Sequence, residues 1–198
     1  TNIDSASPPS EHRHVGAYVE MLISSLIGLV ASLILSIEAI TLATNPAAVL
    51  SCDISSKISC GVVAQTWQAQ LFGWPNSFLG LIAEPVVITV AVAALGGVRF
   101  PRWFMLTAQA IYTLGFLFAW WLFYQSYFVI GALCPWCLLI TITTTLVFMS
   151  MSRVNILDGN FGAGITRALT PALSWWVDVW VSVLIIAALA AAVIFRYL

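Results

Sequence analysis

Five apolar segments, each close to the length needed to cross a bilayer, constrain the fold of this chain more than any other feature. A helix needs about 20 residues to span the hydrocarbon core, and we expect such helices over 21–43, 78–98, 103–124, 129–151 and 176–195. Only 8% of the residues are charged, whereas soluble domains carry about a quarter. The sequence therefore predicts an all-α integral membrane protein with five transmembrane helices.

The connections between these spans are short, which leaves room for one membrane bundle and for no separate soluble domain. Residues 1–18 are predicted to form a disordered cytoplasmic tail, 19–151 a bundle with an outer loop over 45–77, and 152–198 a cytoplasmic connector and the fifth span. The tail lacks the features of a cleaved signal peptide, so the first span is expected to be retained. The net charge of −1 gives no indication of nucleic acid binding.

Basic residues predict the orientation of the bundle, because cytoplasmic loops are enriched in lysine and arginine. Five basic residues fall on one side of a five-span chain and two on the other, so we expect the richer side to be cytoplasmic. The loop over 45–77 then faces outward, into the kind of compartment where disulfides persist. The five are Arg13, Arg99, Arg102, Arg153 and Arg167, and the two are Lys57 and Arg196.

The four cysteines form two pairs that are both expected near the outer face. Cys134 and Cys137 make a C-x-x-C, the spacing of redox-active dithiols, because two intervening residues let the sulfurs close and reopen a disulfide. Pro135 is expected to start a helix that points free N–H groups at the first thiol. This position would bring thiol chemistry next to a lipid-soluble oxidant such as a quinone.

Two other interpretations of the cysteines stay open. Free cysteines are common small apolar residues in membrane helices, and four cysteines can hold zinc or an iron–sulfur cluster. The loop pair, Cys52 and Cys60, encloses seven residues rather than the two to four of a zinc knuckle, and no histidine or carboxylate cluster accompanies it. We therefore favour redox chemistry over an inert or metal-binding role, and predict no metal site.

The outer loop offers a second set of alternatives. A structural disulfide between Cys52 and Cys60 is the default, but a mobile loop dithiol could also carry electrons inward by thiol–disulfide exchange. Residues 61–72 alternate apolar and polar side chains, which predicts one amphipathic helix on the membrane surface, either an anchor or a lid. Asn76 stands where the chain re-enters the membrane; its spacing favours a helix cap over a hydrogen bond to a quinone.

Two carboxylates, Glu38 and Glu84, fall inside predicted spans, where ionised groups are costly and a functional role is the default hypothesis. Each could relay protons to a reduced quinone. The alternative is that each is neutral and hydrogen-bonded to nearby backbone.

Several of these motifs together resemble the vitamin K epoxide reductase family over about 19–150. The resemblance lies in the Cys52-x7-Cys60 loop, the Pro75-Asn76-Ser77-Phe78-Leu79-Gly80 segment and Cys134-Pro135-Trp136-Cys137. Asp53 and Gly61 beside the loop cysteines, with Asn155-Ile156-Leu157-Asp158, are similar to the actinobacterial branch.

The resemblance implies a four-helix bundle around a quinone plus one peripheral helix, in a bacterial plasma membrane. It implies that Cys60 exchanges with an exported thioredoxin-like (DsbA-like) partner and that Cys52 then pairs with Cys134. Cys137 would reduce the quinone, with menaquinone favoured over ubiquinone, and Asn76 would hydrogen-bond a quinone oxygen. The expected function is therefore a quinone-dependent, disulfide-forming oxidoreductase.

Two departures from the family pattern modify these expectations. Many bacterial members carry a fused thioredoxin-like domain after the fifth helix; the sequence ends at Leu198, so we expect a separate partner. Thr141 replaces the tyrosine of the vertebrate enzymes, which argues against vitamin K epoxide as substrate. The DsbB-type quinone oxidases, a rival class, carry their C-x-x-C before the looser pair, the reverse of the order here.

Overall fold

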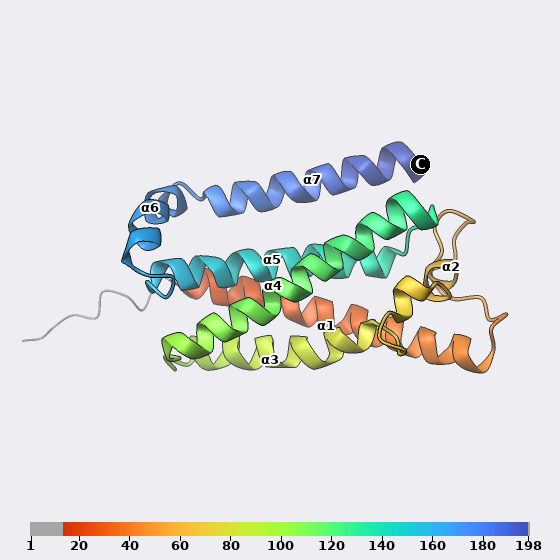
Figure 1. Ribbon diagram of the computed structural model, residues 1–198, viewed down its shortest axis with the longest axis horizontal. Coiled ribbons are helices and arrows are strands. Elements are labelled where there is room, and N and C mark those ends of the chain that lie inside the picture. Colours follow the sequence, from red (N-terminus) through yellow and green to blue (C-terminus); the bar gives the residue numbers. More distant parts are fainter. Residues whose placement is uncertain (1–13, 198) are drawn as a thin grey trace, which may run out of the picture.

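The computed structural model describes residues 14–197 as a bundle of long helices (Figure 1). Five of the described helices are long and apolar enough to cross a membrane, which confirms the predicted fold class. They are α1 (Val15–Thr44), α3 (Ser77–Leu95), α4 (Arg102–Tyr124), α5 (Pro135–Leu157) and α7 (Val177–Tyr197).

Helix α1 is central: it packs most extensively against α3 and α5, and α5 in turn packs against α4. Small side chains permit the close approach of α1 to α3, since a Cβ at Gly80 would collide with the Ser32 side chain. Such small residues are typical of helix interfaces in membranes, where backbones approach closely. Helix α7 lies to one side of this four-helix bundle (Figure 1).

Helix α7 is joined to the bundle near both ends. Arg153 of α5 donates two hydrogen bonds to the Asp178 carboxylate, at 2.7 and 2.8 Å, and lies over the Trp176 ring. Towards the other end, Arg196 lies over the ring of Tyr127. These polar contacts fix the helix where apolar packing alone gives little orientation.

Several boundaries differ from the predicted ones. Residues 15–18, expected in the tail, form the first turn of α1, while residues 1–13 lie outside the described part of the chain. The fourth span begins at Pro135 rather than 129, because α4 continues as a π-helical segment, η3 (Gln125–Ile130), and the chain then turns at Gly131 (φ 74°). Helix α6 (Ala163–Ser174) was not predicted at all.

The two ends of the bundle carry different connections (Figure 1). The long loop after α1, the turn before α5 and the end of α7 lie at one end, with Lys57 and Arg196. The α3–α4 turn and α6 lie at the other, with Arg99, Arg102, Arg153 and Arg167. The described basic residues therefore separate as the five-span prediction required.

Candidate redox site

The loop after α1 is organised around the carboxylate of Asp53. Its oxygens accept hydrogen bonds from Ser59 Oγ (2.6 Å), Gly61 N (2.9 Å) and Leu50 N (2.8 Å). Burial on its own would raise the pKa of Asp53, but the Ser59 hydroxyl and the surrounding backbone N–H groups lower it below its usual range. Asp53 is therefore ionised at neutral pH and ties the two cysteine-bearing segments together.

A short β-bridge between Ile58 and Leu133 holds this loop against the segment that precedes α5. Ser59 N donates to Leu133 O at 3.0 Å, and Leu133 N donates to Lys57 O at 2.9 Å. Cys134 directly follows Leu133, and Cys60 follows Ser59, the residue after Ile58. The bridge therefore places Cys60 beside Cys134, although they are far apart in sequence.

Cys134 is the N-cap residue of α5, and Pro135 follows it at the first helical position. The Cys137 N–H donates to Cys134 Sγ at 3.3 Å. This confirms the expectation that Pro135 starts the helix and directs a free N–H group at the first thiol. The Cys134 sulfur therefore lies at the N-terminus of α5, where backbone N–H groups have no partner within the helix.

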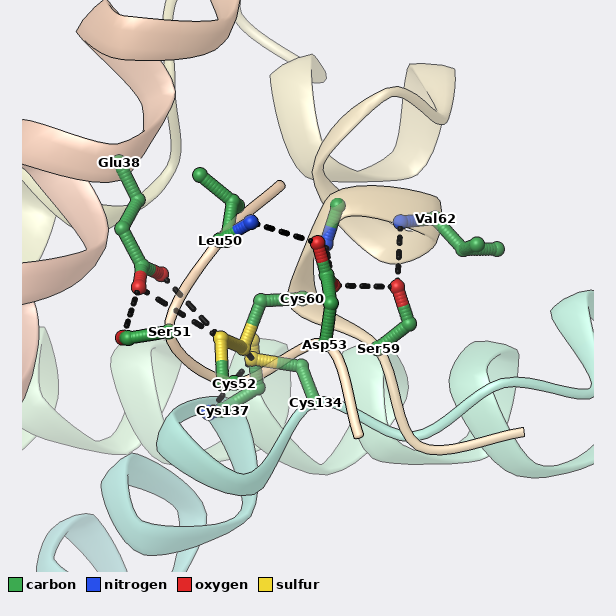
Figure 2. Close-up of a disulfide and its surroundings, with 11 residues drawn as sticks. Glu38, Leu50, Ser51, Cys52, Asp53, Ser59, Cys60, Val62, Cys134 and Cys137 are labelled. Atoms are coloured by element: carbon green, nitrogen blue, oxygen red, sulfur yellow. Dashed lines mark hydrogen bonds between the residues drawn. A yellow bond between two sulfur atoms is a disulfide. The ribbon is translucent and has the colours of Figure 1, made fainter. Parts of the chain in front are cut away.

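The four sulfurs form one cluster (Figure 2). Cys52 and Cys60 are joined in a disulfide, while Cys134 and Cys137 are free. Cys134 Sγ lies 3.2 Å from Cys60 Sγ. The family resemblance implies that Cys52 pairs with Cys134 during the relay. In the structure the loop cysteine beside Cys134 is Cys60, because the bridge at Ser59 positions the following residue.

A cavity of about 1270 Å³ extends from these cysteines into the bundle, and most of its lining is apolar. Cys60, Cys134 and Cys137 line the end nearest the loop after α1, and Met151 lies at the far end. Helices α3 and α4 make few contacts with each other. The cavity lining there includes apolar side chains that are exposed on the bundle surface: Ile82, Val86, Ile111 and Leu114. An apolar molecule could therefore reach the cysteines from the lipid.

Three buried polar atoms on cavity-lining residues have no hydrogen-bond partner among the described residues: Asn76 Oδ1, Glu84 Oε2 and Ser32 Oγ. Buried polar groups are normally hydrogen-bonded, so each orphan atom is a candidate ligand contact. Asn76 Nδ2 donates to Gln68 O at 2.6 Å, and its side chain makes no cap hydrogen bond. Asn76 therefore occupies the N-cap position of α3, as its spacing predicted, but its side chain does not cap the helix, and its free oxygen fits a ligand hydroxyl.

Residues 61–72 do not form the single amphipathic helix that was predicted. They fold as α2 (Cys60–Ala64) and a short 3-10 helix, η2 (Trp67–Gln70), because the chain turns at Gln65 and Thr66. Side chains from both short helices line the cavity, including Val63 and Gln68. Of the two roles considered for this segment, the structure favours a cover over the cavity.

The two span carboxylates occupy different sites. Glu84 is buried beside the cavity, where Tyr112 OH donates to its Oε1 at 3.2 Å. Glu38 contacts the loop instead: Ser51 Oγ donates to Oε1 at 2.8 Å, and Cys52 Sγ lies 3.4 Å from Oε2. The alternative interpretation required each carboxyl to be hydrogen-bonded to nearby backbone. Among the hydrogen bonds of the described residues, the donors to Glu38 and Glu84 are side-chain hydroxyls instead.

Sequence reasoning gave no structural role to Asp53, Ser51 or Tyr112. Asp53 is adjacent to a cysteine, which could have indicated its importance, but nothing local predicts the partners of the other two.

Ligand atoms of Glu38, Cys52 and Cys60 lie within 4.8 Å of one another. With these two sulfurs bonded to each other, they are not thiolates able to bind a metal.

Taken together, the fold and the site define a polytopic membrane protein with two adjacent cysteine pairs at one end of a lipid-accessible cavity. The sequence model of the vitamin K epoxide reductase family matches residues 19–152. The chain belongs to this family, whose members are thiol oxidoreductases associated with quinones. No curated protein matches the chain significantly.

Proposed function

We propose that the protein is a quinone-coupled thiol oxidoreductase that reoxidises an exported thioredoxin-like (DsbA-like) protein and so supports disulfide formation. The observation that carries this proposal is the 3.2 Å separation of Cys60 Sγ and Cys134 Sγ. Two dithiols at this distance can exchange a disulfide without a large rearrangement of the helices.

The exchange begins when a partner thiolate attacks Cys52, and Cys60 leaves as a thiolate. Cys60 attacks Cys134 of an oxidised Cys134–Cys137 pair, and Cys137 leaves. The second partner thiolate then releases Cys52 and completes the partner disulfide. Cys52 attacks Cys60, re-forms the loop disulfide and frees Cys134. Two electrons have moved from the partner to Cys134 and Cys137, which corresponds to the sulfur pairing described above.

Both loop cysteines are buried, so the exchange with a protein partner requires the loop to open. Cys52 is assigned to the partner because Cys60 faces Cys134. This reverses the order that the family resemblance suggested, in which Cys60 met the partner and Cys52 met Cys134.

The electron acceptor is a membrane quinone, taken up as a substrate into the cavity. The Cys134 and Cys137 thiols supply the two electrons and two protons that convert quinone to quinol, and their disulfide forms. Cys137 lines the cavity one turn into α5, and Asn76 and Glu84 offer polar contacts within it. Menaquinone is favoured over ubiquinone, because the residues beside the loop cysteines resemble the actinobacterial branch.

The proposed location is a bacterial plasma membrane, with both cysteine pairs on the outer face. The distribution of basic residues supports this orientation, since four of the described ones lie at the end remote from the cysteines. The domain organisation proposed from the sequence, with catalysis confined to 19–151, follows from the positions of the four cysteines.

The test is quinone reduction by the purified protein in detergent, driven either by reduced thioredoxin or by dithiothreitol. Cys137→Ala is expected to abolish both reactions. Cys60→Ala is expected to abolish the thioredoxin-driven reaction and to spare the dithiothreitol-driven one, because a small dithiol can reduce Cys134–Cys137 directly. Absence of quinone reduction by the wild type, or full activity in Cys137→Ala, would return the cysteines to a structural or metal-binding role.

The order of the relay is tested by trapping. In the double variant Cys52→Ala/Cys137→Ala, Cys60 and Cys134 are the remaining thiols and should form a disulfide quantitatively under mild oxidation. The matched variant Cys60→Ala/Cys137→Ala leaves Cys52 and Cys134, which should link poorly. Peptide mapping by mass spectrometry distinguishes the two. Equal or greater linkage of Cys52 to Cys134 would restore the order suggested by the family resemblance.

A further inference from the structure

Glu38 makes a contact with the shuttle disulfide that the exchange described above does not use. It lies near the outer end of α1 and is almost fully buried, at 8% exposure. Its Oε2 and Oε1 lie 3.4 and 3.6 Å from Cys52 Sγ (Figure 2). Glu38 is not among the cavity-lining residues. Its carboxyl therefore faces the loop sulfurs rather than the quinone site that the sequence suggested for it.

The contact between Glu38 and Cys52 can take part in proton transfer only when the Cys52–Cys60 disulfide is open. A disulfide sulfur has no proton to donate, and the Ser51 hydroxyl is the donor found for Glu38 within the described chain. A Cys52 thiol can donate to a carboxylate, and a Cys52 thiolate can accept a proton from a carboxylic acid. The carboxyl is thus placed to exchange a proton with Cys52 in the reduced intermediates.

We propose that Glu38 is the general acid–base catalyst of the shuttle cysteine Cys52; this rests on the proposed function. When the second partner thiolate attacks the mixed disulfide, Cys52 leaves and takes the proton of the Glu38 carboxylic acid. When Cys52 then attacks Cys60 of the Cys60–Cys134 disulfide, the Glu38 carboxylate takes that proton back, and Cys134 leaves. The carboxyl ends as it began, and no further oxidant or reductant is needed.

The surroundings single out Glu38 for this task. The other titratable groups near it are Cys60, Cys137 and Asp53. Asp53 is committed to three hydrogen bonds that hold the loop, and no contact between its oxygens and a sulfur is found. Cys52 is buried, where an unassisted thiolate is costly, so proton exchange with an adjacent carboxyl has a large effect.

The test compares Glu38→Gln with Ser51→Ala. Glutamine keeps an oxygen to accept from Ser51 but cannot exchange a proton, whereas Ser51→Ala removes the anchoring hydrogen bond and keeps the carboxyl. The readout is the ratio of thioredoxin-driven to dithiothreitol-driven quinone reduction, measured from pH 5 to 9. Glu38→Gln should lower this ratio at least tenfold and remove one ionisation from its pH profile. Ser51→Ala should lower it less than threefold and keep that ionisation.

A second measurement does not depend on turnover. In a Cys60→Ala background, the rate of Cys52 alkylation by iodoacetamide follows the ionisation of its thiol. Replacing Glu38 with glutamine removes a neighbouring negative charge and should shift that titration curve to lower pH. An unshifted curve, an unchanged ratio, or an equal loss in Ser51→Ala would overturn the role of Glu38. Failure of wild-type quinone reduction would instead contradict the proposed function, while the alkylation curve would still report on the proton contact.

Discussion

Replacing Asp53 with alanine should loosen the fold of the cysteine loop without touching a sulfur. The substitution removes three hydrogen bonds, to Leu50 N, Ser59 Oγ and Gly61 N. A net contribution of about 1 kcal/mol for each bond gives roughly 3 kcal/mol of local loop stability. Since about 1.4 kcal/mol corresponds to a factor of ten, the closed loop should become roughly 100-fold less favoured relative to open forms.

Hydrogen exchange measured by mass spectrometry reports this change directly, because amides protected by the closed loop exchange from its open forms. Peptides that cover 50–62 should lose protection in Asp53→Ala, while peptides from α1 and α5 should keep theirs. The thioredoxin-driven rate should fall with the loop, because Cys60 is no longer held near Cys134. Unchanged protection over 50–62 would refute the conclusion that Asp53 organises the loop.

The same carboxylate predicts a pH dependence whose sign follows from its lowered pKa. Burial opposes ionisation of Asp53, but the hydrogen bonds from Ser59 and the backbone N–H groups outweigh it and depress the folded-state pKa. The stabilisation is then fully present above the unfolded value of about 3.9 and is lost as the pH falls through the folded value. Loop protection should be constant from pH 5 to 8, decline below about pH 4, and show no such decline in Asp53→Ala.

Three further substitutions test other parts of the structure. Arg153→Ala removes the paired hydrogen bonds to Asp178 and the contact with Trp176. It should lower the stability of α7 docking by about 1–3 kcal/mol, measured by thermal unfolding in detergent. Stability equal to that of the wild type would show that apolar packing alone holds α7. Gly80→Ala places a Cβ against the Ser32 side chain and should destabilise the α1–α3 interface by about 1–3 kcal/mol. Adding Ser32→Gly should partly restore the stability, and absence of this rescue would place the strain elsewhere. Asn76→Ala removes Oδ1, which can accept from a quinol hydroxyl, and Nδ2, whose second N–H, beyond the one given to Gln68 O, can donate to a quinone oxygen. It should raise the KM for a soluble quinone about tenfold, with little change when thioredoxin is varied. An unchanged KM would exclude Asn76 from the quinone site.

The membrane spans were predictable because their signal is local. Long apolar runs specify helices wherever they pack, and the actual bounds differ from the predicted ones mainly at the ends. The fourth span illustrates the limit. Residues 129–134 are apolar enough to look like part of that span, but the π-helical end of α4 and the turn at Gly131 use them to bring Leu133 to the loop. Helix α6 was missed because its amphipathic sequence is too polar to signal a span.

The cysteine pairs were also predictable from spacing, whereas their mutual order was not. Which loop cysteine meets Cys134 depends on the bridge between Ile58 and Leu133, a pairing of residues 75 positions apart. The partner of Glu38 depends in the same way on how the loop folds back over α1. Both are tertiary facts, and no local propensity or spacing in the chain determines them.

The folded loop also joins the two cysteine pairs to the cavity, so the proposed shuttle and the proposed quinone site form one structural unit. Cys60 begins α2, and residues of α2 and η2 line the end of the cavity nearest the cysteines. The segment that holds the disulfide near Cys134 is therefore the segment that covers the cavity above Cys137. Cys60 and Cys134 are both buried, so soluble thiols cannot reach them while the loop is closed. Because Asp53 ties Cys60 to this cover, its loss should expose Cys137 as well as release Cys60, and alkylation of Cys137 should accelerate in Asp53→Ala in parallel with the loss of amide protection. Acceleration without loss of protection would mean that the cover and the shuttle move independently.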